Sequence, residues 1–82
     1  MNYAVIFTYS FDSDVAVYLF DDEESAKKML KDNYEHELAI DLLENKWDTE
    51  GEISDDGWYA KITNHFTDHD DVTEYRIGNV YR

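Results

Sequence analysis

The chain has 82 residues and no cysteine, and its 20 Asp and Glu residues outnumber 7 Lys and Arg, which gives a formal net charge of −13. Without cysteine, neither disulfides nor thiolate metal sites can form. The charge argues against direct binding to nucleic acid, whose phosphates require cationic side chains, and against binding to anionic membrane surfaces. Aromatic residues make up 16% of the chain, which argues against a disordered acidic tail, so we expect one folded domain over residues 1–82.

The first two predicted elements form a hairpin. Residues 3–10, YAVIFTYS, and residues 15–20, VAVYLF, are rich in β-branched and aromatic side chains, a composition that predicts strands. The intervening FDSD supplies side chains that can bond nearby backbone amides, which favours a turn. Neither face of the first strand is strongly polar, so we expect this strand in the interior of the sheet.

A helix is predicted from residue 23 to the early 40s. Asp21 or Asp22 is a suitable N-cap, and the two glutamates that follow favour the positive end of the helix dipole. One apolar face is predicted from residues that recur at helical spacing, namely Ala26, Leu30, Tyr34 and Leu38.

Two further strands are predicted at residues 57–63, GWYAKIT, and 72–81, VTEYRIGNVY. The acidic part of WDTEGEISDDGWY, residues 47–59, is predicted to be a connector between the helix and the third strand. The expected fold is therefore an α+β domain of order β-β-α-β-β, with an antiparallel four-stranded sheet and one helix packed on one face. If the first and third strands are neighbours, the helix forms a right-handed crossover between them.

The connector partly matches a calcium-binding loop. Aligning Gly51 with the sixth position of an EF-hand loop places Asp48 and Glu50 at the third and fifth positions. The same alignment puts Lys46 and Gly57 at the first and twelfth positions, where the loop needs carboxylate ligands. We therefore expect no calcium site here.

A second candidate metal site is the pair His65 and His69, which lie four residues apart beside Asp68. This spacing suits zinc on a helix, but the segment lies between two predicted strands, where it does not aim both imidazoles at one point. The chain also lacks a cysteine nucleophile and a glycine-rich phosphate loop, and a domain with one helix offers little room for a catalytic cleft. We expect a non-enzymatic protein with no catalytic residue, metal or cofactor.

The acidic residues are concentrated in one segment, because residues 32–56 contain 10 Asp and Glu and a single Lys or Arg. Such a field attracts basic surfaces and raises association rates, and nucleic-acid-binding sites are large basic surfaces. The simpler alternative is that these residues only solvate a helix and a loop. The candidate partner-binding residues are Asp41, Glu44, Trp47, Asp48, Glu50, Glu52, Asp55 and Asp56, with Trp47 as an aromatic anchor.

The acid-rich run DLLENKWDTEGEISDD, the small size and the lack of cysteine resemble those of small acidic α+β proteins carried by bacteriophages and mobile elements, including anti-CRISPR proteins and other DNA mimics. The stretches ISDDGWYAKITNHF and TEYRIGNV also resemble small proteins of Gram-positive bacteria and their mobile elements. The resemblance implies an inhibitory or accessory role, and it carries over no catalytic residue.

Two hypotheses follow from these patterns. The first is a cytoplasmic protein that binds a basic surface, such as that of a nucleic-acid-binding protein, as an inhibitor or DNA mimic. The second is a homo-oligomeric or host-protein interaction module that uses an aromatic sheet face, including Tyr3 or Tyr59, while the acidity serves solubility. The cytoplasmic location is expected because MNYAVIFTYSF lacks the basic and long apolar parts of a signal peptide.

Overall fold

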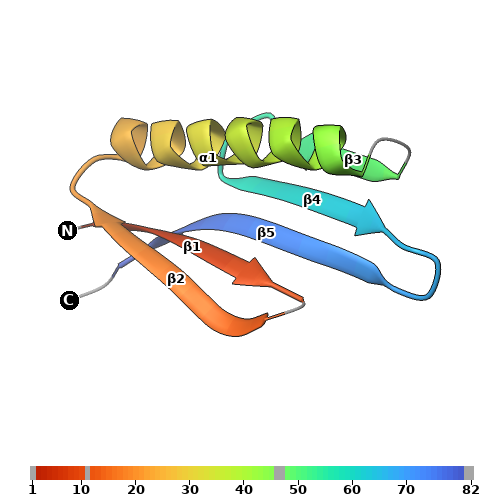
Figure 1. Ribbon diagram of the computed structural model, residues 1–82. Coiled ribbons are helices and arrows are strands. Elements are labelled where there is room, and N and C mark those ends of the chain that lie inside the picture. The colour runs from red at the N-terminus through yellow and green to blue at the C-terminus, as the bar shows by residue number, and fades with distance from the viewer. Residues whose placement is uncertain (1, 11, 46–47, 81–82) are drawn as a thin grey trace.

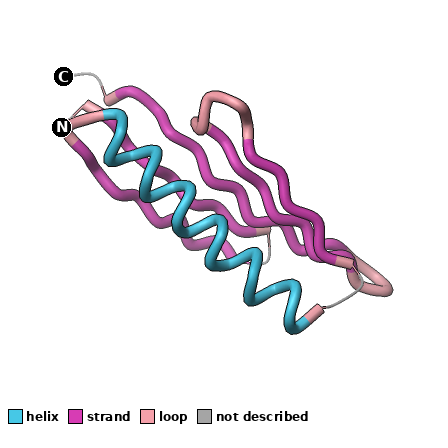
Figure 2. Tube along the Cα trace, turned by 90° about the horizontal axis from the view of Figure 1, so that it is seen from above, coloured by secondary structure: helices cyan, strands magenta, loops and turns pink. Residues whose placement is uncertain are grey.

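The computed structural model describes residues 2–10, 12–45 and 48–80. Within them, a five-stranded antiparallel sheet has the strand order β2-β1-β5-β4-β3, and one helix covers one of its faces (Figure 1). Figure 2 shows that the helix runs along the strands rather than across them. The elements are β1 (Tyr3–Tyr9), β2 (Asp12–Phe20), α1 (Glu23–Glu44), β3 (Thr49–Ile53), β4 (Tyr59–His65) and β5 (Asp70–Asn79).

The prediction of an α+β domain with one helix on an antiparallel sheet is confirmed, but the prediction of four strands is wrong. The fifth strand is β3, which lies in the segment predicted to be a connector and pairs with β4 at the margin of the sheet. The first strand does lie inside the sheet, although its neighbours are β2 and β5 rather than the strand that follows the helix. The helix therefore leads from β2 at one margin to β3 at the other.

Helix α1 begins as its sequence predicts. Asp22 is the N-cap, and its carboxylate accepts a hydrogen bond from the backbone N–H of Ser25 at 3.0 Å. Ala26, Leu30 and Tyr34 are buried against the sheet, in agreement with the predicted apolar face. Within the described residues, no helix is long and apolar enough to cross a membrane.

The core lies between α1 and the face of the sheet that it covers. We call this the helix-covered face and the opposite one the open face. Residues along each strand belong alternately to the two faces, because successive side chains point to opposite sides. Cross-strand partners share a face, so the register fixes the positions across the whole sheet. The core residues are Val5, Phe7, Ala26, Leu30, Tyr34, Ala60, Ile62, Tyr75 and Ile77.

The open face has an aliphatic half and a charged half. Its aliphatic half lies on β2 and β1 and carries Val15, Val17, Leu19, Ala4 and Ile6. Its charged half lies on β5, β4 and β3 and carries Glu74, Arg76, Tyr59, Lys61, Thr63, His65, Glu50 and Glu52.

Candidate partner-binding surface

The acidic edge of the molecule follows the chain from the end of α1, along β3, into the β3–β4 turn. Because β3 is the outermost strand at its margin, side chains of β3 have a neighbouring strand on one side only. We define the acidic edge by five of its exposed carboxylates, Glu44, Asp48, Glu50, Glu52 and Asp55.

β3 is held under the C-terminal half of α1. At Gly51, a β-carbon would lie 2.6 Å from the Tyr34 hydroxyl and 2.9 Å from a methyl group of Leu38. The absence of a side chain therefore lets the helix rest directly on the strand. At the start of β3, the Thr49 hydroxyl lies 3.1 Å from the carbonyl of Asn45 and 2.6 Å from the side-chain oxygen of Asn64, which joins the helix end to β3 and β4.

Two of the predicted partner-binding carboxylates have structural roles. Asp41 is half-buried and accepts a hydrogen bond from the side-chain amide of Asn64 at 2.9 Å, which ties α1 to β4. Asp56 accepts hydrogen bonds from the Ser54 hydroxyl at 2.7 Å and from the backbone N–H of Trp58 at 3.0 Å. These two bonds lower the pKa of Asp56 and close the turn between β3 and β4.

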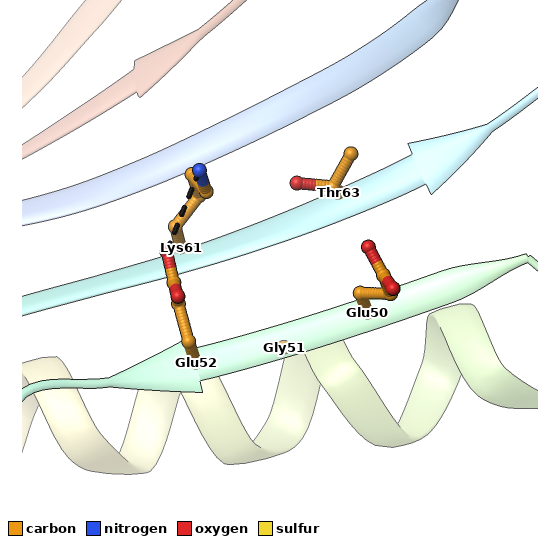
Figure 3. Close-up of a pocket in the computed structure, with 5 residues that line it drawn as sticks. All are labelled: Glu50, Gly51, Glu52, Lys61 and Thr63. Carbon is orange, nitrogen blue, oxygen red and sulfur yellow. Dashed lines mark ion pairs between the residues drawn. The ribbon is translucent and has the colours of Figure 1, made fainter.

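A hollow of about 430 Å³ lies on the open face at the acidic edge. Figure 3 shows Glu50 and Glu52 rising from β3 on either side of Gly51, with Lys61 and Thr63 beside them on β4. The Lys61 ammonium lies 3.4 Å from a Glu52 carboxylate oxygen. Glu50 and Glu52 are two positions apart in a strand, so their Cα atoms are about 6.6–6.8 Å apart.

His65 lies next to the hollow, between two carboxylates. Its Nε2 is 3.0 Å from a Glu50 oxygen, and its Nδ1 is 2.8 Å from an Asp70 oxygen. These hydrogen bonds raise the pKa of His65, because a protonated imidazole donates to both neighbours. Protonation of His65 therefore neutralises part of the charge that Glu50 presents.

The remainder of the charged half forms its own network. The Tyr59 hydroxyl donates to Glu74 at 2.9 Å, and the Arg76 guanidinium donates to the same carboxylate at 2.6 Å. Arg76 and Tyr59 together lower the pKa of Glu74, with Arg76 as the larger cause. Arg76 also lies over the Tyr59 ring, 5.2 Å from its centroid. Tyr59 is thus covered, and Tyr3 packs on the helix-covered face against Trp58.

The structure shows the geometry of the two segments that were considered as metal sites, the calcium-loop alignment and the pair His65 and His69. β3 occupies the middle of the segment that was aligned with a calcium loop, and an extended strand does not wrap around an ion. His69 lies 2.7 Å from Asp68 and stacks on Phe66, whereas His65 faces Glu50 and Asp70, so the two imidazoles have separate partners. Among the described residues, no group of three or more metal-ligating side chains converges.

The sequence analysis named five of the carboxylates that the structure places on the exposed acidic edge, and it missed the cations beside them. Lys61, Thr63 and His65 were not considered as part of the site, although their alternation along β4 places them on one face. The predicted anchor Trp47 lies outside the described residues. Comparisons with protein-family models, with curated proteins and with solved structures find no match to this chain.

Proposed function

We propose that this protein binds a basic surface of a partner protein through the acidic edge, as an inhibitor or accessory factor and not as an enzyme. The observation that supports this most directly is the hollow between Glu50 and Glu52, which opens to solvent at the margin of the sheet. Two carboxylates on a hydrogen-bonded strand are held at fixed spacing, so they can receive an arginine or lysine side chain with little loss of conformational entropy. A nucleic-acid-binding protein is the partner class that this chemistry fits.

A partner side chain that enters the hollow would compete with Lys61 for Glu52. An incoming guanidinium offers a planar set of donors to a carboxylate, whereas the Lys61 ammonium reaches Glu52 at 3.4 Å as a single point charge. A partner arginine therefore replaces a weak, exposed ion pair rather than a buried one. The exposed carboxylates Asp48 and Asp55 lie at the two ends of β3 and extend the attractive field along the edge.

A basic peptide tests this proposal. Fluorescence anisotropy of labelled deca-arginine is measured with the wild type and with the double variant Glu50→Lys/Glu52→Lys, at low and at high salt. We expect wild-type binding that weakens as salt rises, because screening shortens the range of the attraction, and at least tenfold weaker binding by the variant.

The matched control is Glu24→Lys/Glu35→Lys, which changes the net charge equally at exposed positions of α1 and leaves the carboxylates of β3 in place. If this control weakens binding as much as the β3 variant, net charge alone explains the attraction and the proposed surface is wrong. Binding that does not respond to salt would also contradict the proposal.

A further inference from the structure

The two margins of the sheet differ in how they are protected against pairing with another strand. β3 is five residues long, carries Glu50 and Glu52, and is covered by α1 at Gly51. Short length, charge and a covering helix are the means by which proteins prevent strands at sheet margins from pairing with other chains. The opposite margin, β2, is nine residues long, and among the described residues β1 is its only neighbouring strand.

β2 lacks these protective features over its second half. Residues 15–20, VAVYLF, contain no charge, proline or glycine. The pairing with β1 is regular from Thr8↔Val15 to Tyr3↔Phe20, and the irregular step lies beyond it, between Thr8 and Tyr9. No bulge therefore turns this part of the margin away from an incoming strand.

The side chains of this segment are also unusually exposed for their type. On the open face, Val15, Val17 and Leu19 are 56%, 55% and 50% exposed, and Tyr18 on the other face is 44% exposed. Three aliphatic side chains at alternate positions of a marginal strand form a continuous uncharged strip, in a chain whose net charge is −13. A highly charged partner gains nothing from contact with such a strip, because it would have to desolvate its charges.

We infer that β2 pairs antiparallel with β2 of a second copy of this chain, so that two five-stranded sheets form one continuous sheet. The segment is complementary to itself. When Val17 lies opposite the partner's Val17, Val15 lies opposite the partner's Leu19, and all three remain on the open face because cross-strand partners share a face. A two-fold contact uses the same strip twice and leaves only the two protected β3 margins exposed.

The negative charge does not forbid this dimer. Neighbouring strands are about 4.8 Å apart, so the two acidic edges would lie about 43 Å from each other, many times the Debye length of about 8 Å at physiological salt. In the sequence, the uncharged segment is flanked by aspartates on both sides, namely Asp12 and Asp14 before it and Asp21 and Asp22 after it. Antiparallel pairing brings the two flanks towards each other, so salt should strengthen the dimer, whereas it weakens the proposed binding to a basic partner.

The contact is small. Standard interfaces bury roughly 800 Å² per partner through about 20–30 residues a side, more than a six-residue segment can supply. We therefore expect a dissociation constant in the micromolar range or above, and a dimer that presents two acidic edges on opposite sides. Such a dimer binds a partner with two basic sites more tightly than either edge alone.

Sedimentation velocity tests the inference on the wild type and on Val17→Lys and Val17→Asp, from about 10 μM to about 1 mM, where a weak dimer dissociates. We expect a monomer–dimer equilibrium in the wild type, with more dimer at high salt, and monomer alone for both variants. The two variants change the net charge in opposite directions, so a shared loss of dimer reports on the strip and not on total charge. Circular dichroism checks the folding of both variants, which we expect to be retained because the Val17 side chain is about half exposed.

Leu43→Lys is the matched control, because Leu43 is 75% exposed on α1 and its replacement removes an apolar side chain and adds one positive charge. This variant should dimerise like the wild type. Amide hydrogen exchange locates the contact, because alternate amides of an outermost strand point away from its neighbouring strand, and these amides of β2 should become protected as concentration rises. A monomeric wild type at about 1 mM and high salt, or a dimer in which the outward-pointing amides of β2 gain no protection, would overturn the inference.

Discussion

The two ends of α1 are built on opposite electrostatic principles. At the N-terminal end, Asp22 caps the helix, and Glu23 accepts a hydrogen bond from the Trp58 indole at 2.8 Å and pairs with Lys27 at 3.4 Å. Negative charge there is stabilised by the helix dipole. At the C-terminal end the last turn contains no basic residue, although that is where cations are favourable.

The C-terminal end instead gathers carboxylates. Glu37, Asp41 and Glu44 follow at helical spacing, and Asp48 comes just before β3. Burial raises the pKa of Glu37, and the neighbouring Asp41 raises it further. The unfavourable charge is thus concentrated where the helix meets the acidic edge. The carboxylates at the C-terminal end of α1 repel one another and lower the stability of the fold. Residues that lower stability in this way are expected where their charge serves binding.

The largest effect is expected from the contact that holds β3 under this C-terminal half. Gly51→Val places a side chain where atoms of the Tyr34 and Leu38 side chains already lie within 3 Å, and Tyr34 is buried, so these side chains, or the helix and strand that hold them, must move. We expect a loss of about 1–3 kcal/mol in the free energy of unfolding, measured by urea denaturation.

The control is Gly78→Val on β5, where no heavy atom lies within 4 Å of the added β-carbon. It should leave stability unchanged or raise it slightly, because valine is favoured in strands. Equal effects of the two substitutions would show that β3 is not pressed against α1.

Gly51 also explains why the sequence predicted four strands and not five. The segment TEGEI contains a glycine and two glutamates, which are residues depleted in strands, and none of its side chains is fully buried. Its extended conformation follows from pairing with β4 and from contact with the helix, which are tertiary effects. The helix, by contrast, was predictable because its cap and its apolar spacing are local signals.

The candidate site was predictable only in part for a related reason. Acidic residues can be counted along the chain, but their neighbours in space depend on register. Once β3 pairs with β4, Glu52 faces Lys61, and His65 reaches Glu50 from the adjacent strand. The structural role of Asp41 likewise depends on Asn64, which only the fold brings near. The partners of Asp56, by contrast, lie two residues away in the sequence.

The second largest effect is expected at the favourable end of the helix. Asp22→Ala removes the side chain that accepts from the Ser25 backbone N–H, and leaves this donor of the first turn without its partner. We expect the melting temperature to fall by about 4–8 °C, the size that a typical lost N-cap produces in a domain of this length. Asp55→Ala removes the same charge from the exposed turn and should change the melting temperature little, so a matching decrease would assign the effect to charge and not to capping.

A smaller gain is expected at the unfavourable end. Glu44→Lys places a cation in the last turn of α1, where the dipole favours it and where it relieves repulsion from Asp41. The expected gain is about 0.3–1 kcal/mol in the free energy of unfolding at low salt, decreasing as salt rises. Glu35→Lys makes the same charge change in the middle of the helix, away from both termini. An equally large gain in the free energy of unfolding for Glu35→Lys would mean that the charge at the C-terminal end of α1 is not specifically unfavourable.

The smallest effect is expected at Glu37, and it appears as a pH dependence. Burial raises the pKa of Glu37 in the folded state, and Asp41 raises it further, while His36 partly opposes this and Glu44 adds the smallest contribution. Because the folded state binds the Glu37 proton more tightly than the unfolded state does, this residue stabilises the fold as pH falls through the raised folded pKa. Glu37→Gln removes that dependence, so the variant should be more stable than the wild type at neutral pH.

The advantage of Glu37→Gln should shrink on acidification and vanish below the unfolded pKa, where Glu37 is neutral in both the folded and the unfolded state. Thermal unfolding followed by circular dichroism gives the stability of the variant and of the wild type from about pH 4 to about pH 8. The contributions of the other carboxylates cancel when one stability curve is subtracted from the other. Glu35→Gln serves as the reference, because it removes an exposed charge two residues before Glu37 on the same helix. A difference curve that is flat, or that grows towards low pH, would mean that Glu37 is not strained by its neighbours. The carboxylates at the C-terminal end of α1 would then not destabilise the fold, and their retention would need no functional explanation.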